Sequence, residues 1–300
     1  MPVTYRLFYA FTIYMRTIAI FTIFLVLFTG CSLERLAIRS TTGLIENSLE
    51  ATEEETDLIL AEQSIASNLK LLEGMIKTDP NNRNLLLLAT RGFTSYALGF
   101  VEEEDPERAT SFYMRARDYG LRGLRQNRDF DRAFDKPFEE FEASLEHISD
   151  RDIPLLFWTA NAWAGAIQQN IGDPRSLANL PKVEAMMRVV LERNESFYYA
   201  GPHLFFGMIL SSKPTMFGGN TDKGREHFER ALELTENRFL ITKFFYARTY
   251  AVQTLNESLF EDLLNRILEA DLDILPEQKL VNTIAKRRAE ALLEQKDSLF

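Results

Sequence analysis

The most constraining feature of this chain is an uncharged stretch from Ile153 to Asn170, which holds both tryptophans of the protein. Projected as an α-helix at about 100° per residue, its apolar side chains cover the whole circumference instead of one stripe. Such a helix has no polar face to turn towards water, so other helices must enclose it. The stretch therefore predicts a helical body with this segment inside.

One side of that predicted helix combines an amide with aromatic and small residues. Positions at helical spacing share this face: Trp158, Asn161, Ala162 and Gly165. A buried amide needs hydrogen-bond partners. Asn161 therefore either bonds to a neighbouring helix end or points into a ligand cavity, and the sequence leaves both interpretations open.

The N-terminus predicts export and a lipid anchor. An apolar run from Ile18 to Phe28 follows Arg16 and ends in Gly30, directly before Cys31, the only cysteine of the chain. A basic residue, an apolar core of about 7–15 residues and a small residue before the cut describe a secretory signal. The placement of Cys31 resembles a bacterial lipoprotein box, which implies cleavage before this residue and lipidation of its thiol, with palmitate among the acyl chains.

Two alternatives stay open at this end. Met15 is a second candidate start, because the segment from Met15 to Cys31 is by itself a complete short lipoprotein signal. An uncleaved membrane anchor from Leu7 to Phe28 has the required length of about 20 residues. The preferred division is a signal peptide at 1–30, a lipid-anchored N-terminal segment with the first helix at 31–52, and a helical domain at 53–300.

The rest of the chain predicts one helix after another. Apolar residues recur at intervals of three and four, and Asp105 followed by Pro106 is a plausible helix start. No stretch of strand length alternates with a period of two, so no β-sheet is predicted. The predicted helices span residues 33–49, 54–77, 84–100, 108–126, 182–192, 203–209, 223–232, 244–255, 258–269 and 277–295. In the last of these, charged residues including Arg287 and Arg288 suggest a solvated outer face.

Pairs of these helices resemble the tetratricopeptide spacing, in which small and aromatic residues of one helix face an Ala-x3-aromatic-x2-Ala pattern on the next. Residues 203–209 and 223–232 form the clearest pair, and Ala109, Tyr113 and Ala116 carry an earlier one. Such pairs stack, and each buries what its neighbour cannot bury alone. The predicted fold is all-α, built from stacked antiparallel helix pairs as a degenerate tetratricopeptide-like α-solenoid.

The segment at 127–149 interrupts this order. Four phenylalanines recur there at intervals of four, four and three: Phe130, Phe134, Phe138 and Phe141. We expect a short amphipathic helix that packs across the solenoid. The alternative is an aromatic lid over a cavity or a surface for a partner protein.

The sequence offers little that predicts catalysis. His147, His203 and His227 have no metal-ligand partners at suitable spacing on a shared helix face, and nucleophile-elbow and phosphate-loop motifs are absent from the sequence. His203 follows Gly201 and Pro202 and is predicted to cap or pack. With a formal net charge of −10, the chain is also a poor match for nucleic acid. We expect no enzymatic activity, no cofactor and no metal.

Several features together resemble the T component associated with tripartite ATP-independent periplasmic (TRAP) transporters. They are the lipoprotein-type Cys31, the tryptophan helix and, above all, the segment KPTMFGGNTDKGREHFERALEL at 213–234. The resemblance extends from about residue 48 to the end. It implies a lipid-anchored protein on the periplasmic side of the bacterial envelope, which forms a trimer, docks a TRAP-type extracytoplasmic solute-binding protein and contains a passage or cavity. It implies no catalytic residue.

The Gly-Gly loop within that segment has a physical explanation. Gly218 and Gly219 permit backbone angles that are closed to other residues, so the chain can turn sharply before Asn220 or Thr221 caps the next helix. Met216 and Phe217 would then occupy the loop tip, between the repeats or at a ligand entrance.

Two functional hypotheses follow. The first is a transport accessory that binds or passes an apolar or amphipathic solute, and its candidate cavity residues are Trp158, Asn161, Trp163, Met216, Phe217, Gly218, Gly219 and Asn220. The second is an envelope scaffold whose surface binds a protein or peptide. The first predicts a cavity beside Trp158 and Asn161, and the second predicts dry packing there.

Overall fold

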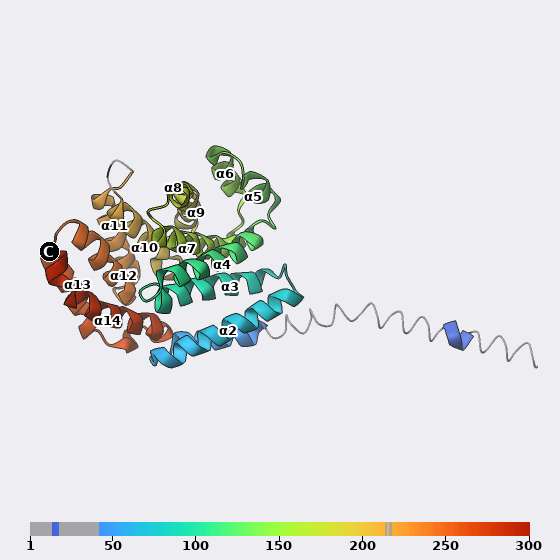
Figure 1. Cartoon of the computed structure of the whole chain (residues 1–300), viewed down its shortest axis with the longest axis horizontal. Helices are drawn as coiled ribbons and strands as arrows, with labels where there is room; N and C mark the ends of the chain where they lie inside the picture. The colour runs from blue at the N-terminus through green and yellow to red at the C-terminus, as the bar shows by residue number, and fades with distance from the viewer. Residues whose placement is uncertain (1–13, 18–41, 214, 216–217) are drawn as a thin grey trace, which may run out of the picture.

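The computed structural model of the protein describes residues 14–17, 42–213, 215 and 218–300. Every regular element in these ranges is a helix (Figure 1), so the all-α prediction is confirmed. Cys31, Met216 and Phe217 lie outside the described residues, as does most of the predicted signal peptide. Among the helices that are described, none is long and apolar enough to cross a membrane.

The N-terminal helices begin at the polar residues that the sequence places before them. Side chains of Asp57, Asn82 and Asp105 accept hydrogen bonds from backbone N–H groups two or three positions later, which satisfies donors that a helix start leaves unpaired. The Asp105 cap, with Pro106 behind it, is therefore confirmed. The elements are a helix at 42–53, α2 (Leu58–Thr78), α3 (Arg83–Tyr96) and α4 (Pro106–Leu124).

The four-phenylalanine segment folds as two short helices and not as the single helix that we predicted. The rings of Phe130 and Phe141 are fully buried, with centroids 5.7 Å apart in an edge-to-face arrangement, and they belong to the same apolar core as the tryptophan helix. Two 3₁₀ turns then lead into the tryptophan helix. The elements are α5 (Arg128–Ala133), α6 (Phe138–Ser144), η2 (Leu145–His147) and η3 (Asp150–Asp152).

The tryptophan helix is enclosed, as its composition predicts. This helix, α7 (Ile153–Gln169), packs against α3, α4 and α9 (Leu180–Arg193), with the short α8 (Pro174–Leu177) between. Its approach to α4 depends on glycine, because a Cβ atom on Gly120 would lie 2.1 Å from the Thr159 hydroxyl. Small residues at the crossing thus let the two backbones come close.

The C-terminal half continues the array of helices. Asn220 accepts a hydrogen bond from the Lys223 backbone N–H at 3.0 Å, so the predicted cap is confirmed. Gly218 has a φ of +85°, and a Cβ on Gly219 would lie 1.9 Å from the Lys213 carbonyl oxygen. Both glycines are therefore required by the turn. The elements are α10 (Phe197–Ser212), α11 (Thr221–Leu234), α12 (Leu240–Phe245), α13 (Glu257–Glu269), η6 (Leu272–Ile274), η7 (Pro276–Gln278), α14 (Lys279–Glu294) and α15 (Lys296–Leu299).

A strained turn opens α10. Tyr198, Tyr199 and Ala200 have φ values of 44°, 56° and 57°, in the left-handed region that costs non-glycine residues about 1–2 kcal/mol each. Aromatic contacts offset this strain: the Tyr198 ring centroid lies 4.6 Å from that of Trp158, and Tyr199 stacks on Phe239 at 4.7 Å. The turn directs Tyr198 towards α7.

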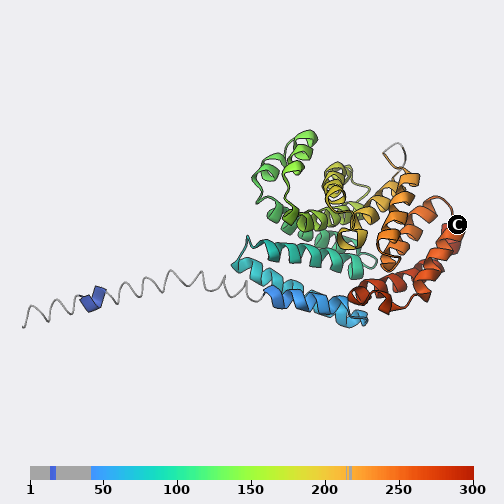
Figure 2. The same cartoon turned by 180° about the vertical axis from the view of Figure 1, so that it is seen from behind.

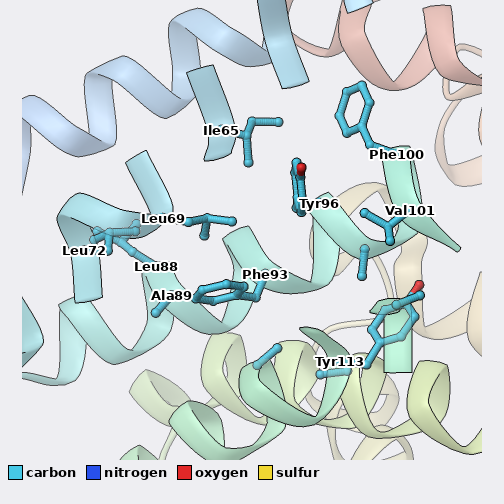
Figure 3. Packing of buried hydrophobic residues seen from close by; sticks show 14 of the residues in the cluster. Ile65, Leu69, Leu72, Leu88, Ala89, Phe93, Tyr96, Phe100, Val101 and Tyr113 are labelled. Carbon is cyan, nitrogen blue, oxygen red and sulfur yellow. The ribbon is translucent and has the colours of Figure 1, made fainter. Parts of the chain in front are cut away.

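The array curves until its last long helix returns to its beginning. In Figures 1 and 2, α14 lies beside α2. Gln278 donates a hydrogen bond to Glu53 at 3.1 Å, and Leu280 and Ile284 of α14 belong to the same apolar core as the side chains of α2 and α3, part of which is drawn in Figure 3. The described helices therefore surround a central space.

Candidate ligand cavity

The central space contains a cavity of about 320 Å³, within the size range of small-molecule sites. Its walls come from both ends of the chain, including the helix at 42–53, α3, α7, α10, α12 and α14. Along α3 and the segment after it, lining residues extend from Arg91 to Glu102, a length of about 16 Å at helical rise. The cavity is thus elongated.

Its middle is apolar. Side chains from five helices meet there without a charge: Leu98, Phe157, Leu204, Met208, Phe245 and Ile284. Phe157 and Phe245 are buried against the surrounding core. A surface of this kind favours a ligand with an apolar segment.

One end of the cavity is aromatic. Arg91 lies against two rings, with its guanidinium carbon 5.7 Å from the Trp158 centroid and 5.5 Å from that of Tyr198, a favourable position for a cation. The same arginine forms an ion pair with Glu53, so the charge at this end is compensated. Burial raises the pKa of Tyr198, and its hydroxyl stays protonated at neutral pH.

Asn161 lies on the cavity wall, but its amide does not bond to a neighbouring helix end. Its Nδ2 donates to the Phe157 carbonyl of its own helix at 3.0 Å. No described residue donates to its Oδ1. The amide oxygen is therefore available at the cavity surface, beside Trp158.

The other predicted site residues lie elsewhere. Trp163 does not line the cavity but stacks on Phe134 at 5.8 Å, on another side of α7. Gly218, Gly219 and Asn220 lie in the α10–α11 connection and are not among the lining residues. Of the eight residues proposed from the sequence, the structure thus brings Trp158 and Asn161 together at the cavity, while Met216 and Phe217 fall outside the described residues.

The opposite end of the cavity is polar. Tyr113 donates a hydrogen bond to Glu102 at 2.6 Å, and Arg288 approaches the other oxygen of that carboxylate at 3.3 Å. Burial, followed by the charge of Glu102, raises the pKa of Tyr113, so its hydroxyl remains a donor. Arg248 also lines this end and is exposed.

The position of Arg288 differs from our prediction. We expected a solvated position on the last long helix, but the residue is only 2% exposed. Its guanidinium donates to the Leu98 carbonyl, and the neighbouring Arg287 donates to the Gly99 carbonyl at 2.8 Å. These carbonyls belong to a π-helical segment, where the regular hydrogen-bond ladder changes. The arginines therefore tie α14 to the end of α3.

Two π-helical segments lie at this polar end. The first, η1 (Ala97–Val101), contributes Leu98 and Gly99 to the cavity wall, and the second, η5 (Tyr246–Ala251), contributes Arg248 and Thr249. Single π-turns inside helices occur frequently at functional sites. Both π-helical segments thus contribute to the wall at this end of the cavity, and helix periodicity alone does not reveal them.

A second depression lies on the surface between α4, α5 and α9. It has a volume of about 940 Å³ and is wide open. Phe134 and Trp163 form its floor, and Arg117, Arg125 and Lys182 are placed over these rings at 4.5–5.6 Å. We call it the basic groove. It is an open depression of the surface and not an enclosed cavity.

The histidines form no described metal site. His203 and His227 share a hydrogen bond between their Nδ1 atoms at 2.9 Å, and His203 Nε2 lies 3.0 Å from Glu195, which also accepts from Arg230. The prediction that His203 packs omitted this network. Among the described residues, no group of three or more His, Cys, Asp or Glu is arranged to hold a metal ion.

Most of the polar cavity residues could not be recognised from the sequence. Arg91, Arg248 and Arg288 each belong to an amphipathic or apolar helix, where an arginine ordinarily faces water. Tyr198 was missed because its position depends on a left-handed turn without glycine. The available signal was the pair Tyr198–Tyr199 shortly before Gly201 and Pro202, a sequence that does not continue a regular helix.

The chain is similar to a known protein family and to a bacterial relative. A family model described as "TRAP transporter T-component" matches residues 54–300. A relative from Treponema pallidum (strain Nichols), named "Uncharacterized protein", is 26% identical over 305 aligned positions, which cover 90% of this chain and 93% of the relative. The family match includes every wall of the cavity except the helix at 42–53.

Proposed function

Because the chain belongs to the TRAP transporter T-component family, which is a transporter component and not an enzyme, we propose that it is a lipid-anchored accessory protein of a TRAP-type transport system. In this proposal it docks an extracytoplasmic solute-binding protein and receives an apolar or amphipathic solute in its central cavity. Lipid on Cys31 would hold it on the periplasmic side of the envelope, as a homo-oligomer, with a trimer as the expected state.

The observation that carries the solute part is the cavity itself. Its middle is apolar, it lies beside Trp158 and Asn161, and its volume of about 320 Å³ suits a small ligand. Side chains that line an apolar cavity gain contacts when a solute occupies it.

Native mass spectrometry tests the solute part. The full chain, released from lipid nanodiscs, is expected to carry a bound small molecule. Ala164 lines the cavity and is partly buried, so Ala164→Trp should fill the space and remove the bound mass. Ala143 is exposed and distant from the lining, and Ala143→Trp is the matched control. A wild-type chain without any bound mass would argue against a solute.

The docking part is tested separately. A purified TRAP-type solute-binding protein is titrated against the full chain in nanodiscs, with binding followed by light scattering or sedimentation velocity. We expect saturable binding, and the sedimentation of the chain alone reports whether it is a trimer. Absence of binding at high concentration would remove the docking claim but leave the solute claim intact.

The basic groove supports a second candidate, an envelope scaffold that binds a protein or peptide. Arg122 and Lys182 in the groove have no carboxylate partner within ion-pair distance among the described residues. An acidic peptide would complement them. If Arg122→Glu abolishes partner binding while Ala164→Trp does not, the scaffold is the better description.

A further inference from the structure

The charges around the central cavity are unevenly distributed. At the aromatic end, Arg91 is paired with Glu53. At the polar end, Arg288 approaches two carboxylates, Glu102 at 3.3 Å and Glu103 at 3.2 Å. Arg248 lines the same end, and among the described residues it has no carboxylate within ion-pair distance, so its positive charge is not compensated by a direct ion pair.

The two arginines surround one ring. The guanidinium carbon of Arg248 lies 5.9 Å from the centroid of Phe244, and that of Arg288 lies 5.8 Å from the same centroid. Burial and the charge of Glu102 raise the pKa of Tyr113, and the positive charges of Arg288 and Arg248 partly oppose this rise. Two elements far apart in the sequence, η5 and α14, thus bring two guanidinium groups to the same end of the cavity.

Both guanidinium groups have unused hydrogen-bonding capacity. Arg248 is exposed, and no carboxylate lies within ion-pair distance of it among the described residues. Arg288 is buried, and its Nη1 has no hydrogen-bond acceptor. A buried donor without an acceptor is rare and costly, so such a group requires an explanation. An oxygen of a bound anion at this end would supply the acceptor.

We propose that the polar end of the cavity, formed by Arg248 and Arg288, binds the anionic head group of an amphipathic solute whose apolar tail occupies the middle of the cavity. This inference rests on the proposed solute-binding function and names the chemistry of the solute. The head group is a carboxylate or a similar oxyanion. Its tail extends towards Trp158, along the length between Glu102 and Arg91.

The tail and the head group of the solute contribute differently to binding. Burial of the tail supplies most of the affinity, because it is proportional to the apolar area removed from water. The head group then decides orientation and selectivity. Arg248 meets the anion first at the exposed end, and Arg288 contributes a fixed charge held in place by the Leu98 carbonyl and Glu102.

A series of twelve-carbon probes tests the inference. Dodecanoate, dodecan-1-ol and dodecyltrimethylammonium share one tail and differ in head-group charge. Binding to the full chain in nanodiscs is followed by tryptophan fluorescence in Trp163→Phe, which leaves Trp158 at the cavity as the only tryptophan. Empty nanodiscs correct for partitioning into lipid. We expect dodecanoate to bind about tenfold more tightly than the alcohol.

A charge variant assigns the preference to this site. Arg248→Gln should reduce the advantage of dodecanoate over dodecan-1-ol to less than about threefold, without changing the affinity for the alcohol. Arg225→Gln makes the same charge change on α11, at an exposed position away from the cavity, and should preserve the advantage. Circular dichroism confirms that both variants are folded.

The possible results distinguish the anion site from the binding of an apolar solute in the cavity, on which it depends. If the three probes bind equally, or the cationic probe binds best, the anion site is wrong while an apolar cavity stands. If none of them binds, both the apolar solute and its head group are wrong. If Arg225→Gln weakens dodecanoate as much as Arg248→Gln does, the preference reflects net charge and not this site.

Discussion

At the scale of single residues, small side chains determine how closely the helices approach. Gly120 of α4 meets Thr159 of α7, and Gly165 of α7 meets Tyr113 of α4, where an added Cβ would lie 2.7 Å from the ring. These contacts fix the spacing of two helices that form one side of the cavity. Not every glycine has such a role: Gly74, on the exposed side of α2, has no atom within 4 Å of an added Cβ.

Replacing glycine by alanine should therefore have opposite effects on the free energy of unfolding at these two positions. Gly120→Ala should lower the free energy of unfolding by about 1–3 kcal/mol, because the methyl group overpacks the α4–α7 contact. Gly74→Ala should raise it by about 0.5–1 kcal/mol, because alanine favours a helix interior. Urea denaturation of both variants checks the pair. A neutral result for Gly120→Ala would show that the helices separate easily.

Leu255 has a strained backbone conformation that no side-chain packing offsets. Leu255 has a φ of 51° and is 71% exposed, so its side chain contributes little burial. Leu255→Gly should stabilise the protein by about 1 kcal/mol, since glycine adopts this conformation without steric cost. Leu60→Gly, at an exposed position inside α2, should instead destabilise it by a similar amount. Thermal unfolding distinguishes these signs.

At the scale of helices, the sequence predicted most elements and some of their ends. Apolar periodicity located the long helices, and polar caps such as Asp105 and Asn220 defined their starts, because both are local properties. The π-helical segments and the left-handed turn at Tyr198 were not predictable, since tertiary contacts stabilise them against local preference. Arg288 was misassigned for the same reason: its acceptors, the Leu98 carbonyl of η1 and the Glu102 carboxylate, lie far away in the sequence.

In the candidate site, too, local features were predictable from the sequence and features that depend on tertiary contacts were not. Trp158 and Asn161 were predictable because one helix presents them together. The cavity itself depends on how helices from many parts of the chain meet, which no single helix encodes. Trp163, on the same helix, was proposed with them but faces the basic groove. Helical periodicity therefore identified the helix correctly and only part of its lining surface.

The pairing of α10 and α11 should weaken in acid. Burial, followed by the charges of His203 and Lys223, lowers the pKa of His227 from 6.5 to about 4. Between these values the unfolded chain binds the proton more readily than the folded one. The free energy of unfolding should therefore fall as the pH drops from 6.5 towards 4, by at most about 1.4 kcal/mol per pH unit from this group.

Urea titrations across this pH range check the effect. His227→Gln should flatten the dependence between pH 6.5 and 4, whereas His147→Gln, at an exposed site, should leave it unchanged. Glu195 has a pKa lowered to about 2 by Arg230 and His203, so its contribution is lost in a separate window below pH 4.5. An unchanged slope in His227→Gln would show that His227 is not buried in neutral form.

At the scale of the whole molecule, the two ends of the array stabilise each other. Leu280 and Ile284 of α14 share a core with Ile65 of α2 and Phe93 of α3, although more than 180 residues separate them. Such contacts make the first and last helices one cooperative unit.

This coupling predicts a long-range effect of a local change. Leu280→Ala removes buried apolar volume and should cost about 2–4 kcal/mol. Hydrogen exchange, followed by mass spectrometry, should then increase in α2 and α3 as well as in α14. Leu299→Ala, in the partly buried terminal α15, is the control and should not affect α2. Exchange that increases in α14 alone would mean that the ends unfold independently.

The return of α14 to α2 also has a consequence for synthesis. A growing chain emerges from its N-terminus, and helices that are already complete begin to fold first. The wall that carries Leu280, Ile284 and Arg288 is translated after the walls formed by α3, α7 and α10. A nascent chain therefore cannot enclose a solute, and the cavity comes into existence only when the C-terminal helices have been released and have docked.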